Sequence, residues 1–307
     1  MQTKVVLPEF LIPGDKIALI APARKTTLQD LEPFIKLVNQ ADLEVIYTPN
    51  LFAVQNQYGG SDDLRAADFQ YWLDDPCIKA ILSVRGGYGT GRIIDKLDFT
   101  KFQEHPKWLI GFSDFTVIHS HVNCLLNIPT LHAAMPAFLK SDSLPDVVQS
   151  FVAMFDVLKG NLPNYTLPEN TMNGPGNCSG KLIGGNLSVI YSIMGSVSEL
   201  KTDNCILFLE DLDEYFYHLD RMMVCLKRAG KLKNLKGIIL GHMNDMHDSA
   251  ISFGKNTEEI IYEHTHDLNI PLYFGFDAGH LKLNLPLIFG MPVEIENNCL
   301  NFENSNS

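Results

Sequence analysis

Short apolar runs alternate with segments of helical spacing over the first 135 residues of this 307-residue chain. Five runs have the length and composition of buried strands: 16–22, 43–47, 80–84, 107–111 and 130–133. Parallel strands need crossover segments of this kind between them, and strands covered on both faces are apolar throughout. The N-terminal half is therefore predicted to be an α/β domain built on a parallel sheet.

The segments between these runs carry helix signals. Leu31, Phe34 and Val38 recur at helical spacing, and residues 117–126 form a second such segment. Ser61 is a suitable N-cap for a further helix, because its hydroxyl oxygen can accept a hydrogen bond from a free backbone N–H of the first turn. These helices are expected to cover the faces of the sheet.

The second half of the chain is separated from the first by a change in composition. A helix is predicted at 145–158, and residues 161–180 are then rich in Pro, Gly and Asn, which predicts a linker. Beyond it, strand and helix signals resume at 206–209, 215–228, 237–241, 271–275 and 287–295. We therefore predict an N-terminal domain at 1–160 and a smaller, mixed α/β C-terminal domain at 181–307.

Charge and cysteine usage exclude several classes of protein. The formal net charge is −12, which argues against binding to nucleic acid or to an anionic membrane, since phosphate contact requires clustered Lys and Arg. No apolar stretch has the length of a signal peptide or of a membrane span. The six cysteines form no Cys-x-x-Cys pair. We predict a cytoplasmic protein with reduced thiols.

A glycine-rich segment, Arg85-Gly-Gly-Tyr-Gly-Thr-Gly-Arg92, follows the third predicted strand. Its glycines permit positive φ angles and let backbone N–H groups approach a ligand closely. No Gly-Lys-Ser/Thr follows, so the segment is not a phosphate-binding P-loop. The segment can be a turn that merely needs glycine. It can equally be a turn that donates hydrogen bonds to an oxyanion.

Ser113 lies in Gly111-Phe-Ser-Asp-Phe115, between the fourth predicted strand and a helix. A serine at this turn projects its hydroxyl at the carboxyl edge of the sheet, where ligands bind in open α/β folds. The helix N-terminus can also offer N–H groups to a developing negative charge. Ser113 is therefore a candidate nucleophile, although a helix-capping role is equally compatible with its position.

A nucleophilic serine needs a base, and the base needs an acceptor that orients it. Among the ten histidines, His132 and His280 stand directly after predicted strands or beside glycines. The residues alone do not decide which of the two is the base. Glu210 is the first of four acids after the strand at 206–209, so it is best placed to face a cleft. Asp211 and Asp213 could instead favour the following helix N-terminus.

Two histidine-rich segments, 241–248 and 264–267, contain side chains of the types that bind metal ions. Neither has the His-Glu-x-x-His spacing of a helical zinc site, and no cysteine pair assists. We predict that these histidines are solvated and that the protein uses no metal and no cofactor.

Several separated segments together resemble one family, the LD-carboxypeptidases or muramoyltetrapeptide carboxypeptidases, to which the microcin C self-immunity peptidases are related. The resemblance is carried by residues 14–22, 84–89, 110–114, 184–186, 209–211 with 220–221, and 279–280. These segments span most of the chain in the order of the family, so their combination is far more specific than any one of them.

The resemblance implies a serine peptidase with its active site in a cleft between two domains. By motif position the nucleophile is Ser113, the acid Glu210 and the base His280. The implied oxyanion hole uses backbone N–H groups of Gly86, Gly87 and Asp114. The family is also usually homodimeric.

The implied substrate is a murein tetrapeptide, cleaved between an L-configured centre and the terminal D-amino acid during cell-wall recycling. Substrate-binding residues by motif are Arg85, Tyr88 and Asn186, and a carboxylate partner is expected among Arg85, Arg92 and Arg221. One alternative is a microcin C-immunity-type serine amidase that acts on a peptidyl-nucleotide or another acyl amide. A second is a binding protein that holds a small ligand between two lobes without catalysis.

Overall fold

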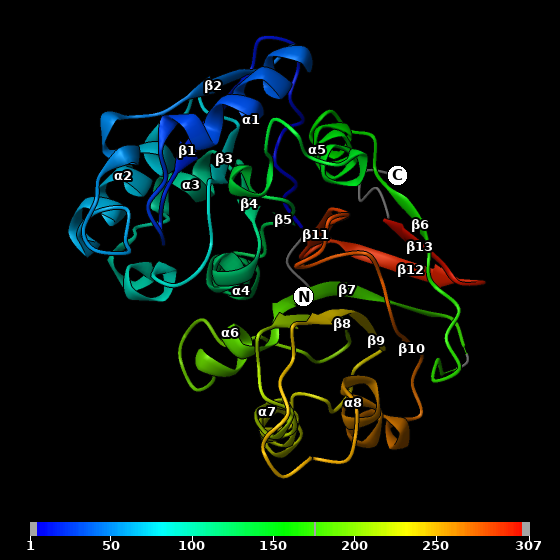
Figure 1. Ribbon diagram of the computed structural model, residues 1–307. Coiled ribbons are helices and arrows are strands. Elements are labelled where there is room, and N and C mark those ends of the chain that lie inside the picture. Colours follow the sequence, from blue (N-terminus) through cyan, green and yellow to red (C-terminus); the bar gives the residue numbers. More distant parts are fainter. Residues whose placement is uncertain (1–4, 175, 303–307) are drawn as a thin grey trace.

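Two β-sheets organise the computed structural model, which describes residues 5–174 and 176–302 (Figure 1). The predicted domain and linker ranges also include residues 1–4, Pro175 and 303–307, which lie outside the described residues. All six cysteines lie within the described part of the chain and are unpaired, as predicted.

The first sheet contains six strands in the order β11-β5-β4-β3-β1-β2. Its strands are β1 (Lys16–Ile20), β2 (Glu44–Ile46), β3 (Ala80–Ser83), β4 (Trp108–Gly111), β5 (Thr130–His132) and β11 (Leu287–Phe289). The first five are parallel to one another, and β11 is antiparallel to β5. All residues of β3 and β4 are buried, which explains why both runs are apolar throughout. The predicted parallel sheet is thus confirmed.

Five helices accompany this sheet: α1 (Leu28–Gln40), α2 (Asp62–Asp74), α3 (Thr100–Glu104), α4 (Thr116–Leu125) and α5 (Pro145–Leu158). Thr27 closes a capping box at the start of α1, and the Ser61 hydroxyl accepts from the N–H of Leu64 at the start of α2. The prediction that Ser61 is an N-cap is therefore confirmed.

The second sheet contains seven strands in the order β10-β9-β8-β7-β12-β13-β6. They are β6 (Asn164–Thr166), β7 (Cys178–Asn186), β8 (Cys205–Leu212), β9 (Gly237–Asn244), β10 (Leu272–Tyr273), β12 (Pro292–Glu296) and β13 (Cys299–Phe302). β7 to β10 are parallel, whereas β12, β13 and β6 form an antiparallel extension. Three further helices belong to this half: α6 (Leu187–Ser192), α7 (Phe216–Arg228) and α8 (Thr257–Thr265).

The segment at 287–295, predicted to close the C-terminal domain, is divided between the two sheets. Gly290, with a φ angle of 88°, breaks the run into two strands that join different sheets. β11 pairs with β5 of the first sheet, and β12 pairs with β7 of the second. The segment expected to be a linker also contributes β6 to the edge of the second sheet.

The two sheets share a continuous apolar core. Leu131 on β5, Phe208 on β8 and Phe289 on β11 are fully buried members of one cluster. Helix α4 lies between the sheets and contacts β5 on one side and β7 on the other. In Figure 1, α5 lies between the two halves on the side where β6, β12 and β13 are found. This packing brings the carboxyl ends of β3 and β4 towards those of β7 and β8.

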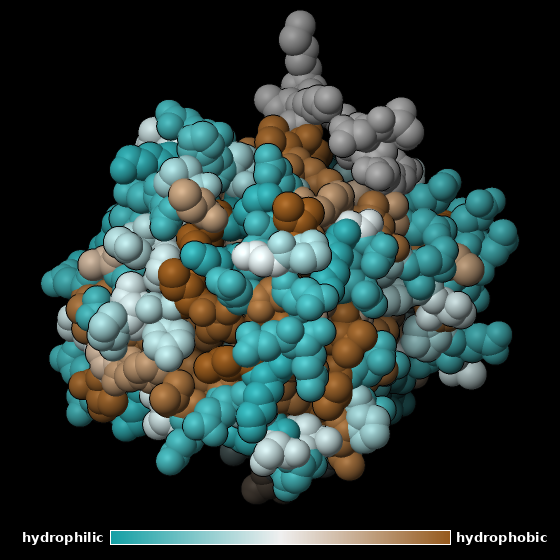
Figure 2. Space-filling model, turned by 90° about the horizontal axis from the view of Figure 1, so that it is seen from above, coloured by the Kyte–Doolittle hydropathy of each residue, from teal (hydrophilic) through white to brown (hydrophobic). Residues whose placement is uncertain are grey.

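The surface seen from above is mostly hydrophilic, with hydrophobic residues gathered in a band across its middle (Figure 2). Exposed apolar side chains such as Ile251, at 88% exposure, are ordinary for a protein surface when they are scattered. No helix in the described ranges is long and apolar enough to cross a membrane.

Candidate active site

Ser113 stands at the turn between β4 and the short 3₁₀ helix η4 (Ser113–Phe115), which leads into α4. Its φ angle is 61°, in the left-handed region that costs an ordinary side chain on the order of 1–2 kcal/mol. Such strain at a strand-to-helix turn is typical of a nucleophile elbow, where it exposes the hydroxyl at the sheet edge. The side chain of Ser113 is half-buried.

Ser113, His280 and Glu210 form a hydrogen-bonded chain. The Ser113 Oγ lies 3.1 Å from Nε2 of His280, and the His280 Nδ1 lies 2.7 Å from Oε2 of Glu210. Glu210 is fully buried, and the His280 side chain is 8% exposed. The buried carboxylate accepts a hydrogen bond from the His280 Nδ1–H, which leaves Nε2 free to accept one from the serine hydroxyl. The geometry matches that of a Ser-His-acid triad.

A local irregularity in the second sheet gives Glu210 its position. The β8–β9 register shifts between Leu209 and Asp211, so that two residues of β9 stand opposite the single residue Glu210. Bulges of this kind commonly re-aim a side chain beside an active site. Two glycines leave the space: a Cβ at Gly241 would lie 3.1 Å from the Glu210 Cβ, and one at Gly279 would lie 2.7 Å from its Oε2.

The pKa of His280 is raised above its ordinary value of 6.5. Burial alone would lower this pKa, because it disfavours the charged imidazolium. The negative charge and hydrogen bond of Glu210, together with the charge of Asp211, outweigh the burial. The site therefore stabilises the imidazolium that a general base becomes after it accepts a proton.

The glycine-rich turn after β3 faces Ser113. A Cβ at Gly86 would lie 3.3 Å from the Ser113 Oγ, a tight contact, so glycine eases the close approach of the two segments. Gly87 has a φ angle of 108°. Among the described residues, the N–H groups of Gly86 and Gly87 have no hydrogen-bond acceptor. They are therefore available to an oxyanion.

Two buried side chains anchor this turn. The Asp114 carboxylate accepts a hydrogen bond from the N–H of Thr90 at 2.8 Å. Burial raises the pKa of Asp114, although this hydrogen bond lowers it. Arg65 of α2, at 2% exposure, donates to the carbonyl of Gly89 at 2.9 Å and also to that of Pro22. The sequence predicts Asp114 as a helix cap or, by the resemblance, as a donor through its backbone N–H. Sequence reasoning missed Arg65, although helical spacing places it on the buried face with Phe69.

The predicted substrate-binding residues differ in their surroundings. Arg85 and Tyr88 are exposed on the glycine turn. Asn186 is 4% exposed: its Nδ2 donates to Asp211 at 2.8 Å, and its Oδ1 accepts from the N–H of Val189 at the start of α6. The Asn186 side chain is thus occupied within the protein.

Asp211, next to the triad acid, is a buried residue that the sequence reasoning assigned to a helix N-terminus. Its carboxylate instead accepts from the N–H groups of Ser188 and Leu212 and from the Asn186 amide. Burial and the charge of Glu210 raise the pKa of Asp211 to about 7, although these three donors lower it. Asp211 therefore joins β8 to the start of α6.

The second histidine left open by the sequence, His132, does not reach Ser113. It is fully buried among aromatic rings, with Phe112, Phe208 and Phe289 at centroid distances of 5.3–5.6 Å. Neither ring nitrogen has a hydrogen-bond partner among the described residues. Burial lowers the pKa of His132 well below 6.5.

The remaining candidates for ligands are engaged in separate contacts. The imidazole nitrogens of His247 and His264 lie 2.5 Å and 2.8 Å from carboxylate oxygens of Asp213 and Asp220. Within residues 5–174 and 176–302, no three His, Cys, Asp or Glu side chains gather as a metal site would require. Asp213 is also 70% exposed at its side chain, in contrast to Glu210.

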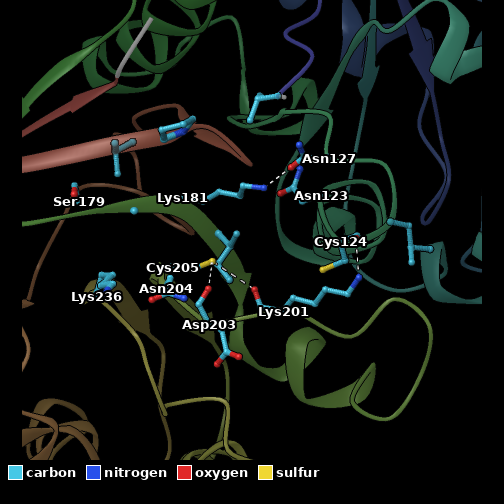
Figure 3. A pocket seen from close by; sticks show the side chains of 16 residues that line it. Asn123, Cys124, Asn127, Ser179, Lys181, Lys201, Asp203, Asn204, Cys205 and Lys236 are labelled. Carbon is cyan, nitrogen blue, oxygen red and sulfur yellow. Dashed lines mark hydrogen bonds between the residues drawn. The ribbon is translucent and has the colours of Figure 1, made fainter. Parts of the chain in front are cut away.

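Two hollows flank the sheets at opposite edges. One of about 470 Å³ adjoins His280 and is also lined by Asp146, Asn244, Asp245 and Asp277. The other, of about 780 Å³, lies at the N-terminal ends of β7 to β9, where Lys181 points towards Asn127 and Lys201 towards Cys124 (Figure 3). Only the first adjoins the triad.

Comparison with known proteins identifies relatives over both halves of the chain. Residues 17–133 match the LD-carboxypeptidase N-terminal domain, and residues 179–295 match the LD-carboxypeptidase C-terminal domain. A Bacillus subtilis protein named "Probable murein peptide carboxypeptidase" is 32% identical over 290 residues, which cover 92% of this chain and 89% of that protein.

Two solved structures share the fold. The muramoyltetrapeptide carboxypeptidase of Oxalobacter formigenes superposes with a TM-score of 0.84 at 24% identity and covers 94% of this chain and 99% of its own. MccF in complex with glutamyl sulfamoyl guanosine superposes with a TM-score of 0.86 at 21% identity, covering 99% of this chain and 100% of its own. The two-domain α/β architecture is common to all three.

Proposed function

This chain belongs to the LD-carboxypeptidase family, and we propose that it is a serine carboxypeptidase acting on murein tetrapeptides. The proposed reaction hydrolyses the amide bond between an L-configured centre and the C-terminal D-amino acid. The observation that carries the proposal is the chain of contacts from Ser113 Oγ through His280 to the buried Glu210, at 3.1 Å and 2.7 Å.

In the proposed mechanism, His280 Nε2 accepts the Ser113 proton while the Oγ attacks the amide carbonyl. Glu210 holds the Nδ1 proton and stabilises the imidazolium. The N–H groups of Gly86, Gly87 and Asp114 receive the oxyanion. The imidazolium then protonates the leaving amine, the D-amino acid departs, and water activated by His280 hydrolyses the acyl-enzyme.

Substrate contacts are proposed for the exposed residues Arg85 and Tyr88, which lie on the turn that carries Gly86 and Gly87. For Asn186 we propose an indirect contribution, because its amide is bonded to Asp211 and to the first turn of α6. The proposal also retains a homodimer, as the family resemblance implies, and a cytoplasmic location, as the sequence predicts. Light scattering on the purified chain tests the dimer.

The proposed function is tested with three compounds in parallel. We expect a murein tetrapeptide ending in D-Ala to release free D-Ala, whereas the epimer ending in L-Ala should not react, because its methyl group would point where a hydrogen had been. An aminoacyl sulfamoyl nucleoside, the ligand class in the MccF complex, is the third compound. Preferential cleavage of the nucleoside would replace the carboxypeptidase by an immunity-type amidase. Binding of all three without any turnover would leave only a binding protein.

A further inference from the structure

The proposed carboxypeptidase reaction brings a second negative charge close to Ser113. Three bonds, each about 1.3–1.5 Å long, separate the scissile carbonyl carbon from the carboxylate carbon of the departing amino acid. The carboxylate must therefore lie within about 4 Å of the carbon that Ser113 attacks. Its binding partner has to stand beside the oxyanion turn, and an arginine is the best suited side chain.

Three arginines, which lie in this region or were named from the sequence, make contacts with other parts of the protein. Arg92 makes a two-pronged contact with Asp62, at 2.6 Å and 3.0 Å. Arg65 is buried and donates to Gly89, as described above. Arg221 of α7 packs over the ring of Tyr217, at 5.3 Å from the ring centre. Arg92 and Arg65 are thus held by partners within the protein, and Arg221 lies on α7. Arg85, exposed on the glycine turn, is the alternative that the test below includes.

Arg24, which sequence reasoning did not consider, stands at the required place. It follows the carboxyl end of β1, which neighbours β3 in the sheet, and β3 in turn neighbours β4 and Ser113. A Cβ at Gly87 would lie 2.5–2.8 Å from the Nε, Cδ and Cγ of Arg24. The stem of Arg24 thus rests on the oxyanion turn itself, in space that only a glycine leaves.

The guanidinium of Arg24 is also unpaired. Arg24 is exposed, and in the described part of the chain no carboxylate forms an ion pair with it and no hydrogen bond engages its side chain. Because its stem is held against Gly87, less side-chain freedom is lost when a ligand binds. A free, partly fixed guanidinium next to the oxyanion donors is the arrangement that a C-terminal carboxylate requires.

We propose that Arg24 binds the free carboxylate of the substrate's C-terminal residue and thereby makes the enzyme a carboxypeptidase. This assignment rests on the proposed function. It places the leaving amino acid on the side of the glycine turn that faces β1. Arg24 acts as a specificity-determining residue, because it touches the part of the substrate that distinguishes a chain end from an internal amide.

The test compares two peptides and four proteins. kcat/KM is measured for a murein tetrapeptide ending in D-Ala and for its C-terminal amide, with the wild-type enzyme, Arg24→Gln, Arg85→Gln and the matched control Arg92→Gln. The wild type is expected to prefer the acid by roughly 10²-fold, since the amide cannot form the charge-assisted contact between guanidinium and carboxylate. Arg24→Gln should lose about that factor on the acid, mainly through KM, and none on the amide. Arg92→Gln should keep the wild-type preference.

The outcomes distinguish failure of the Arg24 assignment from failure of the proposed function. An Arg24→Gln enzyme that folds, by its circular dichroism and melting temperature, and keeps the preference for the acid overturns the Arg24 assignment alone. So does loss of the preference in Arg85→Gln but not in Arg24→Gln, which would move the carboxylate site to Arg85. A wild-type enzyme that cleaves neither peptide overturns both the assignment and the proposed function.

Discussion

At the scale of single residues, the candidate site depends on a serine in a strained conformation and on a carboxylate without access to water. Ser113 has a φ angle of 61°, and Glu210 is fully buried. Both features cost stability unless partners compensate. His280 contacts both side chains, so the three residues are expected to fail together when one is changed.

Replacement of Ser113 by Ala should abolish turnover. Loss of a triad nucleophile commonly costs on the order of 10⁴-fold or more in kcat, while the site keeps its shape. The assay is release of D-Ala from a murein tetrapeptide, with Ser192→Ala, at an exposed serine of α6, as the control. Near-wild-type kcat in pure Ser113→Ala would exclude the serine mechanism.

Glu210→Gln should lower kcat by on the order of 10³–10⁴-fold, because a neutral amide cannot stabilise the imidazolium and can hold the wrong tautomer. Asp213→Asn is the matched control: it removes a neighbouring acid of the same sequence segment, which is 70% exposed and paired with His247. Its kcat should stay near the wild-type value. Equal losses in both variants would mean that the acid cluster acts jointly.

The pH dependence of kcat/KM follows from the raised pKa of His280. Only the neutral imidazole can accept the Ser113 proton, so activity should rise with pH with a midpoint above 6.5. In Glu210→Gln the charge of Glu210 is gone, while burial and the charge of Asp211 remain, so the midpoint should move to lower pH than in the wild type. A pH profile of both enzymes checks this, and a midpoint that moves upwards would contradict the role of Glu210.

At the scale of elements, glycines in loops decide how closely the parts of the site approach. Gly86 brings the turn after β3 against Ser113, and Gly279 lets the loop after β10 close over Glu210. The bulge between β8 and β9 adds the change of direction that Glu210 needs. The triad is therefore assembled from the turn after β4, a position within β8 and the loop after β10.

Gly279→Ala should impair both stability and catalysis. The φ angle of 111° is strained for alanine, and the new Cβ would lie 2.7 Å from the Glu210 Oε2. We expect a loss of about 1–3 kcal/mol in unfolding free energy and at least a tenfold drop in kcat. Gly275→Ala in the same loop is the control, since it is strained by a φ angle of 81° but its Cβ meets no atom within 4 Å.

The loss of unfolding free energy and the loss of kcat are measured separately. Urea unfolding gives the stability of each variant, and kcat is taken where both are fully folded. The control should lose stability without losing kcat. If Gly279→Ala also keeps its kcat, close packing of this loop on Glu210 is not required for the reaction.

At the scale of the whole molecule, the chain crosses between its two halves more than once. β11 comes from the C-terminal half but completes the first sheet beside β5, and both halves contribute to one apolar core. The division into domains at 161–180 stays a proposal. Its consequence for stability is testable, because Trp72 and Trp108, the two tryptophans, both lie in the N-terminal half.

Ile288→Ala on β11 should lower the unfolding midpoint that tryptophan fluorescence reports. Ile288 is fully buried against the first sheet, and truncation of a buried isoleucine costs about 2–5 kcal/mol. The midpoint by loss of activity should fall equally, and Ile251→Ala, at a residue 88% exposed, should change neither. A fluorescence midpoint that stays at the wild-type value would mean that the N-terminal half unfolds on its own.

Much of this protein follows from its sequence because the relevant signals are local. Apolar runs and helical spacing predict the first sheet and its helices, and they predict α5 with the same ends, at Pro145 and Leu158. The turn after β4 predicts that Ser113 lies at the sheet edge, and the end of the apolar run at 206–209 singles out Glu210. These predictions need only a few neighbouring residues, since strand periodicity and turn chemistry are properties of short segments.

The tertiary structure decides what depends on how distant segments pack. His132 and His280 both follow predicted strands, but one is enclosed by aromatic rings and the other bridges Ser113 and Glu210. Gly290 and Pro292 mark the break locally, but the sequence does not tell which sheet each of the two strands joins. The contact of Arg24 with Gly87 joins two loops more than 60 residues apart. Such contacts are set by the order of strands and the approach of two sheets, which no single segment specifies.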